Sequence, residues 1–304
     1  MSIHSTVAHD VPAFEWERRP RRRAWLQAIA RFGARKPLGA AGIVIIMTMA
    51  AMAVLAPLVS PFDPNYVRAQ DRLRPPDVPF FFGTDQLGRD VLSRIIWGAR
   101  ISLFVGFISV GIGTGAGSLL GIVSGYWGGA PDMFIQRGMD ALMAFPTLIL
   151  ALVIMSVLGI GIANAMIAIG IVMAPQMGRV VRGAVLSVKQ SQYVDAARAI
   201  GASDFRIVYQ HIVPNVTAPV VILATAGLGT AILTEASLSF LGFGTPPNVA
   251  SWGADLSSAG RAFLEQAPWL GLFPGIAISL AVLGFNLLGD ALRDIWDPRL
   301  RASR

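Results

Sequence analysis

Long stretches without charged residues constrain this 304-residue chain more than any other feature. Crossing the hydrocarbon core of a bilayer takes about 20 apolar residues. One stretch is too long for a single span, and the sequence GIGIAN at 159–164 divides it into two. The sequence therefore predicts six membrane spans, drawn from the uncharged stretches 37–62, 101–131, 141–178, 212–234 and 266–289.

The composition agrees with an all-α membrane protein. Charged residues make up 14% of the chain, whereas soluble domains contain about 25%. The chain has no cysteine, which excludes disulfide frameworks, cysteine metal sites and thiol catalysis. Its three histidines, at positions 4, 9 and 211, are too scattered to indicate a metal cluster.

The distribution of Lys and Arg predicts that both termini are cytoplasmic. With six spans, the segments placed inside hold 18 basic residues and those placed outside hold 7, as the positive-inside rule requires. The basic leader, residues 1–36, contains RRPRRR. Because an apolar span follows it, we expect the leader to contact lipid rather than nucleic acid.

Small residues and prolines indicate how the spans pack. The stretch 101–131 contains glycines at 111, 115, 117, 121 and 125, a spacing that lets helices approach closely in lipid. Ordinary packing of a helical bundle is the simplest interpretation. Pro146 and Pro175 are expected to kink the third and fourth spans.

The sequence carries no catalytic motif that we can identify. A P-loop needs a lysine after a glycine, and neither Lys36 nor Lys189 follows one. There is also no H-E-x-x-H or G-x-S-x-G sequence. Glu235, near the predicted outer end of the fifth span, either lines a pathway or caps a helix or pairs with a neighbour.

A polar stretch, YVDAARAIGASDFRIVYQHIVPN at 193–215, interrupts the membrane pattern, and we call it the elbow. Its helical spacing predicts one apolar face from Tyr193 to Ile200 and a second from Phe205 to Ile212. Gly201 is expected to end the first helix and Ser203 to cap the second. We expect ordered helices with apolar faces to bind a partner rather than form a solvated loop. The remaining features are the i,i+3 pair Asp195 and Arg198, the apolar Ala196 and Ala197, Asp204 in the first turn of the second helix, and Pro214 at the return to the membrane.

The elbow resembles the EAA loop of binding-protein-dependent ABC transporter permeases. The family pattern is E-A-A, three residues, G, nine residues, I-x-L-P. This chain has Asp195, Ala196 and Ala197, then Gly201, and then HIVP ending at Pro214. The spacing is intact, although Asp replaces Glu at 195, His replaces Ile at 211 and Val replaces Leu at 213.

Three more stretches resemble the dipeptide/oligopeptide C-type permeases in the same order. They are FGTDQLGRDVLSRIIWGARISL at 82–103, EASLSFLGFGTPPNVASWG at 235–253 and LGDALRDIWDPRLR at 288–301. The resemblance runs from about residue 30 to residue 301. It implies the type I ABC importer permease fold, in a prokaryotic inner membrane. The expected organisation is a basic cytoplasmic segment (1–36), a first transmembrane helix (37–62), an extracytoplasmic loop (63–97), a transmembrane core (98–289) with a coupling loop (179–215), and a cytoplasmic tail (290–304).

The resemblance also implies a mechanism with several partners. A second permease would complete the pathway, two ATP-binding subunits would bind ATP and Mg²⁺, and an extracytoplasmic protein would deliver a di- or oligopeptide. This chain itself would bind no cofactor. The expected ATPase contact comprises Tyr193, Asp195, Ala196, Ala197, Arg198, Gly201, Ala202, Ser203, Asp204, Phe205 and Pro214.

Other roles are assigned with alternatives. Glu235, Ser237 and Phe240 are candidates for the pathway or its gate. Asp85, Arg89 and Asp90 either contact the binding protein or belong to a structural cap, and the turn residues around them favour the cap. Nickel, glutathione or another small solute is the alternative cargo. A secondary transporter or channel acting alone, and a membrane scaffold, are the alternatives of a different class.

Overall fold

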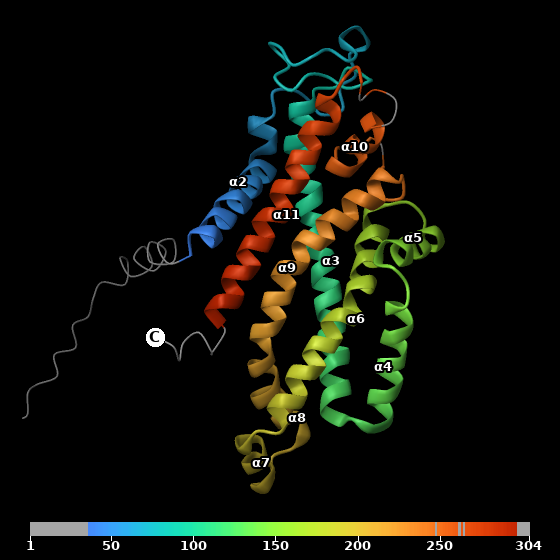
Figure 1. The fold of residues 1–304 in the computed structure, drawn as a ribbon. Coiled ribbons are helices and arrows are strands. Elements are labelled where there is room, and N and C mark those ends of the chain that lie inside the picture. Colours follow the sequence, from blue (N-terminus) through green and yellow to red (C-terminus); the bar gives the residue numbers. More distant parts are fainter. Residues whose placement is uncertain (1–35, 247, 261–262, 264, 297–304) are drawn as a thin grey trace, which may run out of the picture. The chain divides into compact units, whose positions relative to one another are not determined.

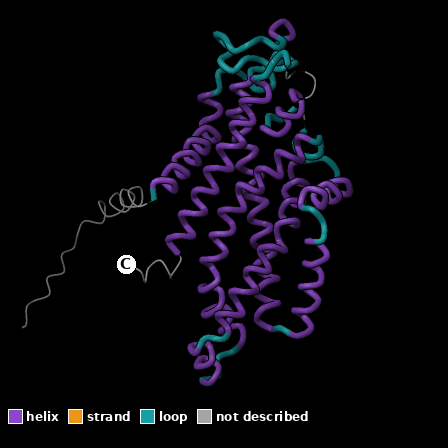
Figure 2. The backbone as a smooth tube through the Cα atoms, in the orientation of Figure 1, coloured by secondary structure: helices purple, strands orange, loops and turns teal. Residues whose placement is uncertain are grey.

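The computed structural model describes residues 36–246, 248–260, 263 and 265–296. The chain divides into two units, Met1–Pro37 and Leu38–Arg304. The first unit lies almost wholly outside the described residues, together with the predicted surface leader, so the second is described here. Helices form nearly all of its regular structure, and no strand occurs in the described residues (Figures 1 and 2). The longer helices are α2 (Pro37–Val59), α3 (Val91–Trp127), α4 (Gly129–Met143), α5 (Thr147–Leu158), α6 (Ile162–Lys189), α7 (Gln192–Ala199), α9 (Val213–Phe240), α10 (Trp252–Gly260) and α11 (Trp269–Trp296).

Five helical stretches are long and apolar enough to cross a membrane, and a sixth follows if one bent pair is counted. The bent pair is α4 with α5, which meet at 95°. Pro146 lies at the bend in an extended conformation, as a residue without an N–H group favours. The break expected at 159–164 is present, because Gly159 has a φ of 86° and α6 begins at Ile162. The helix α6 continues through Pro175.

The structure moves the start of the second span. The helix α3 begins at Val91, so residues 91–97, expected in the loop that precedes it, are already helical. Its N-cap is Asp90, whose Oδ2 accepts a hydrogen bond from Ser93 N at 2.8 Å. A capping carboxylate satisfies a free amide of the first turn. The helix therefore starts in the polar segment, before the uncharged stretch begins.

Glycines on one side of α3 explain its close packing against α6. A Cβ atom placed on Gly121 would lie 2.5 Å from Gly178 O and 2.9 Å from Val181 Cβ. Gly117 and Gly125 face the same helix, whereas Gly111 and Gly115 have nothing within 4 Å. Three of the five glycines thus let two backbones meet, as the small-residue spacing predicts.

The bundle has two distinct ends. In Figure 1, α7 and α8 (Asp204–Ile207) lie at one end, which we call the elbow end. The loop 60–90 and α10 lie at the other, which we call the loop end. Buried apolar residues form one cluster through the bundle and a second at the elbow end that includes Tyr126, Val194 and Ile207.

Candidate functional site

The elbow is an ordered helix–glycine–helix unit. The helix α7 ends in a Schellman motif, in which Ala202 N donates to Ala197 O at 3.0 Å and Gly201 N donates to Arg198 O at 2.9 Å. Gly201 has a φ of 82°, a conformation that side chains other than glycine seldom adopt. Ser203 Oγ then accepts from Arg206 N at 3.4 Å and caps α8. These features confirm the expected helix end and cap.

The two faces of the elbow differ from those expected. Val194 and Ala197 are buried in the elbow-end cluster, with Ile207 and Ile212. Ala197 is 7% exposed and is not available to a partner, which corrects its assignment to a docking surface. The reason is that Ala197 lies on the same side of α7 as Val194, and both belong to the buried elbow-end cluster.

Large apolar side chains are exposed on the side of the elbow that faces away from the buried cluster. Ile200 is 86% exposed, Phe205 79%, Tyr209 67% and Tyr193 45%. The rings of Phe205 and Tyr209 are parallel, with centroids 6.4 Å apart. Ala196 is exposed beside them. Large side chains held on ordered helices, rather than scattered singly, mark an interaction surface.

One polar contact fixes the elbow to the bundle, and a second joins α6 to α3 at the same residue, Tyr126. Tyr126 Oη, at the end of α3, donates to Asp204 Oδ1 at 2.6 Å. Lys189 Nζ donates to the carbonyl oxygen of Tyr126 at 2.5 Å. Asp195 and Arg198 approach to 3.5 Å at the surface, as their spacing predicts. No local pattern indicates the role of Tyr126, because 78 residues separate it from Asp204.

The second elbow helix runs into the bundle without a break. A π-helical turn at Val208–Ile212 joins α8 to α9, and Val213 N donates to Val208 O. Pro214 has no N–H to offer Gln210 in a regular α-helix, and a wider turn accommodates this loss. Residues 204–240 therefore form one helical rod, and Pro214 lies within it rather than at a boundary.

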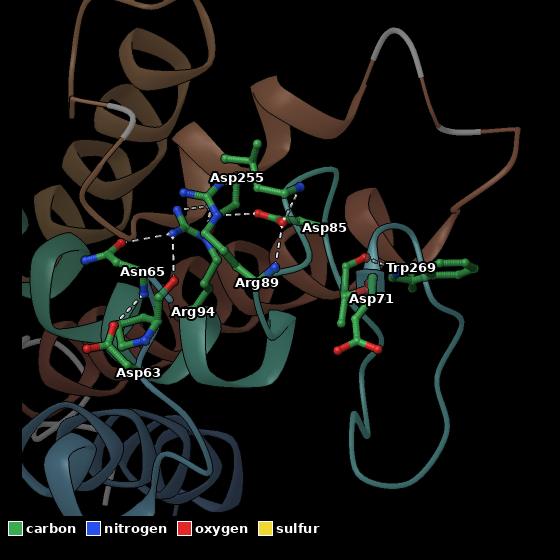
Figure 3. A network of polar contacts seen from close by, with 11 residues as sticks. Asp63, Asn65, Asp71, Asp85, Arg89, Arg94, Asp255 and Trp269 are labelled. Atoms are coloured by element: carbon green, nitrogen blue, oxygen red, sulfur yellow. Dashed lines mark hydrogen bonds and ion pairs between the residues drawn. The ribbon is translucent and has the colours of Figure 1, made fainter. Parts of the chain in front are cut away.

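At the loop end, the three charged residues proposed as alternative contacts are buried. Asp85 is 4% exposed, Arg89 6% and Asp90 1%. Arg89 Nε donates to Asp85 Oδ2 at 2.6 Å (Figure 3). Asp85 Oδ1 also accepts from the amides of Leu87 and Arg89. Of the two alternatives for these residues, their burial favours the structural cap, in which they hold the loop together.

Arg94 joins three segments beside this pair. Its Nε donates to Asp255 Oδ1 of α10 at 2.7 Å, and its Nη1 donates to Pro64 O at 3.1 Å (Figure 3). Burial raises the pKa of Asp255, and the Arg94 guanidinium opposes that shift. Trp252 adds a hydrogen bond from Nε1 to Ile95 O at 3.0 Å. Sequence reasoning did not find Asp255, because its partner lies 161 residues away.

Glu235 is buried among hydroxyl groups. It is 1% exposed, and its carboxylate accepts from the hydroxyls of Ser102, Ser239 and Thr245 at 2.8–3.3 Å. Of the two alternatives for Glu235, pairing with neighbours is the one observed. Ser237 and Phe240 lie on the other side of α9, where they line an apolar groove with residues of α10 and α11.

Two family models match this chain. Residues 117–302 match the model of the binding-protein-dependent transport system inner membrane component. Residues 24–76 match the N-terminal transmembrane domain of oligopeptide transport permease C.

Relatives match almost end to end. The chain is 43% identical over 281 residues to a dipeptide transport system permease protein of Alkalihalophilus pseudofirmus, covering 91% of each chain. It is 40% identical over 282 residues to a glutathione transport system permease protein of Pectobacterium atrosepticum, covering 92% of this chain and 93% of the relative. A dipeptide transport system permease protein of Haemophilus influenzae is 41% identical over 266 residues, covering 86% and 90%. This chain, an integral membrane protein, therefore belongs to the family of inner membrane components of binding-protein-dependent transport systems.

Proposed function

We propose that this chain is a permease subunit of an ABC importer that carries short peptides across a prokaryotic inner membrane. A second permease completes the pathway, two ATP-binding subunits attach at the elbow, and an extracytoplasmic protein delivers the peptide. The chain catalyses no reaction and binds no cofactor itself. ATP and Mg²⁺ are held by the ATP-binding subunits.

The elbow is the observation that carries this proposal. A soluble partner has to bind an exposed surface that is held rigidly, because a flexible loop transmits little movement. The outward side chains Ile200, Phe205 and Tyr209 provide the surface. The Schellman motif at Gly201 and the bond from Tyr126 to Asp204 provide the rigidity. Closure of the ATP-binding subunits would then move α9 directly, since α8 and α9 form one rod.

The assignment of peptide cargo follows the relatives. Two of them are named for dipeptides and one for glutathione, itself a short peptide. Glutathione is therefore the second candidate cargo. Nickel or another small solute, and transport by this chain alone without ATP, remain the alternatives that the experiment below has to exclude.

Uptake in proteoliposomes tests the proposal. We expect the chain to co-purify with a second permease and ATP-binding subunits, and to import labelled dialanine only with ATP and the binding protein. Phe205→Asp or Ala196→Trp should lower uptake at least tenfold, because a charge or a bulky ring spoils an apolar contact. Phe205→Leu and Ala196→Ser are the matched controls and should retain most uptake.

Two results would contradict this role. Uptake by the chain alone without ATP would assign it to secondary transporters. Wild-type uptake in both Phe205→Asp and Ala196→Trp would show that the elbow does not couple ATP hydrolysis to uptake. It would not decide the identity of the cargo.

A further inference from the structure

A cleft of about 160 Å³ opens on the side of the bundle where α3, α5, α6 and α9 meet. Seven of its eleven lining residues are apolar or glycine, and we call it the polar cleft after the other four. Its polar side chains are Thr114, Thr147, Gln176 and Thr230, one from each helix. Figure 1 shows these four helices side by side. None of the residues lining the cleft is charged.

The cleft lies within the length of a predicted span. Gln176 is near the centre of α6 (Ile162–Lys189). At 1.5 Å per residue it is about 20 Å from either end of the helix. The uncharged stretch 141–178 ends two residues after Gln176, and Arg179 and Arg182 follow on the same helix. Gln176 therefore lies in the half of the predicted span that is nearer the elbow end.

The polar side chains of the cleft are not satisfied within the chain. Gln176, Thr147 and Thr230 are exposed, and within the described residues their side chains have no hydrogen-bond partner. Thr114 Oγ1 is buried and also has no partner there. Leaving such groups in hydrocarbon is costly.

Other threonines in the helices behave differently. The hydroxyls of Thr48, Thr217, Thr225 and Thr234 each donate to the carbonyl oxygen four residues earlier, at 2.8 Å. This bond is the usual way in which a helix satisfies threonine. Thr114 and Thr230 do not make it, although both lie within helices. Their hydroxyls remain available to something that enters the cleft.

The lipid-facing surface elsewhere has a different chemistry. Exposed side chains near the middle of α2 and α11 include the apolar Met47, Val54, Ile276, Leu280 and Leu283. The exposed Thr48 of α2 has its hydroxyl bonded within the helix. A surface inside a predicted span that carries a glutamine and two exposed threonines without hydrogen-bond partners is therefore unsuited to lipid. It suits a water-filled passage and its cargo.

We propose that this cleft is a contact site for the main chain of the transported peptide, with Gln176 as its central residue. The inference rests on the proposed function. A glutamine side chain donates and accepts hydrogen bonds as a peptide group does, and threonine hydroxyls do the same. The absence of charge gives the cleft no preference among cargo side chains. Met173 and Met177, which also line it, are flexible enough to accommodate side chains of different shape.

Thiol labelling tests whether the cleft faces water. The chain has no cysteine, so Gln176→Cys introduces its only thiol. A charged methanethiosulfonate reagent should modify Cys-substituted 176 in the full complex, resting or turning over ATP, at least tenfold faster than Leu280→Cys. Leu280 is 41% exposed on the apolar surface of α11 and is the matched control. Equal, slow labelling at both positions in both states would overturn the proposal.

Uptake tests whether the peptide main chain is the ligand. Gln176→Leu and Thr230→Val should each lower the maximal uptake rate about threefold to tenfold, the size expected for one neutral hydrogen bond. The loss should be equal for dialanine, Phe-Ala and Lys-Glu. Thr48→Val, whose hydroxyl is bonded within α2, should leave uptake unchanged.

Each other outcome counts against the proposal. Unchanged rates in both variants would leave the cleft as a water passage only. A loss confined to one peptide would indicate recognition of side chains. Loss of the second permease on purification of Gln176→Leu would make the cleft a subunit contact. If the wild-type complex imports no dipeptide, the proposed function fails, while labelling at 176 still reports on the cleft.

Discussion

Arg94 joins three segments of the loop end. Its guanidinium bonds to the segment before α3, through Pro64 O, and to α10, through Asp255. The side chain is 3% exposed and that of Asp255 is 12% exposed. A buried ion pair adds little to stability when compared with apolar residues, but the removal of one partner leaves the other charge uncompensated.

This asymmetry gives a prediction for Arg94. Arg94→Leu should destabilise the protein by about 3–5 kcal/mol, as for other buried pairs broken on one side. The double variant Arg94→Leu/Asp255→Leu should recover much of that loss. Thermal unfolding of the purified complex in detergent measures both. Arg100→Leu, at an exposed position of the same helix, is the control and should have little effect. Equal unfolding temperatures for the single and double variants would contradict the pairing.

The contact of α3 with α6 is the most extensive helix pair of the bundle, and glycine makes it possible. Gly117, Gly121 and Gly125 recur every four residues and lie against α6. Each lacks the Cβ atom that would separate the backbones. Because the pair connects the loop end to the elbow end, its spacing affects both.

The two kinds of glycine in α3 should respond differently to alanine. Gly121→Ala would place a methyl group 2.5 Å from Gly178 O, and overpacking of this kind costs about 1–3 kcal/mol. Gly115→Ala meets nothing within 4 Å and should be neutral or stabilising by up to about 1 kcal/mol. Unfolding temperatures of the two variants provide the comparison. A Gly121→Ala protein as stable as Gly115→Ala would show that the helices separate without strain.

Local sequence signals predicted most of the helices, but not which side chains of each helix are buried. The uncharged stretches predicted the spans, Pro146 predicted a bend, and Gly201 and Ser203 predicted the two helix ends in the elbow. The burial of Ala197 was missed, because burial depends on which distant segments pack against a residue. The partners of Glu235 and Arg94 were missed for the same reason, since Ser102 and Asp255 lie more than 130 residues away.

One helical rod connects the proposed contact for the ATP-binding subunits to the loop end of the bundle. Residues 204–240 span about 55 Å at 1.5 Å per residue. Phe205 and Tyr209 lie at one end of the rod, Thr230 lies in the polar cleft, and the buried Glu235 cluster lies near α10. In the proposed mechanism, a displacement at the elbow reaches the cleft through this single element, across the π turn at Val208–Ile212.

This arrangement requires the elbow end to face the cytoplasm, where ATP is available. The basic residues favour that orientation, with 18 in the segments assigned inside and 7 in those assigned outside. Two single-cysteine variants test it, because the chain has no other thiol. Val78, in the loop at the loop end, is 70% exposed. Ala130, exposed at the start of α4, lies at the elbow end away from the proposed ATPase contact.

We expect Val78→Cys to react with a membrane-impermeant maleimide in spheroplasts, and Ala130→Cys to react only after detergent permeabilisation. The cysteine-free wild type is the control for labelling of other chains. Labelling of Ala130→Cys in intact spheroplasts, with Val78→Cys protected, would reverse the orientation. The elbow would then face away from ATP, so the same result would exclude it as the contact for the ATP-binding subunits. The topology and the coupling mechanism therefore depend on one measurement.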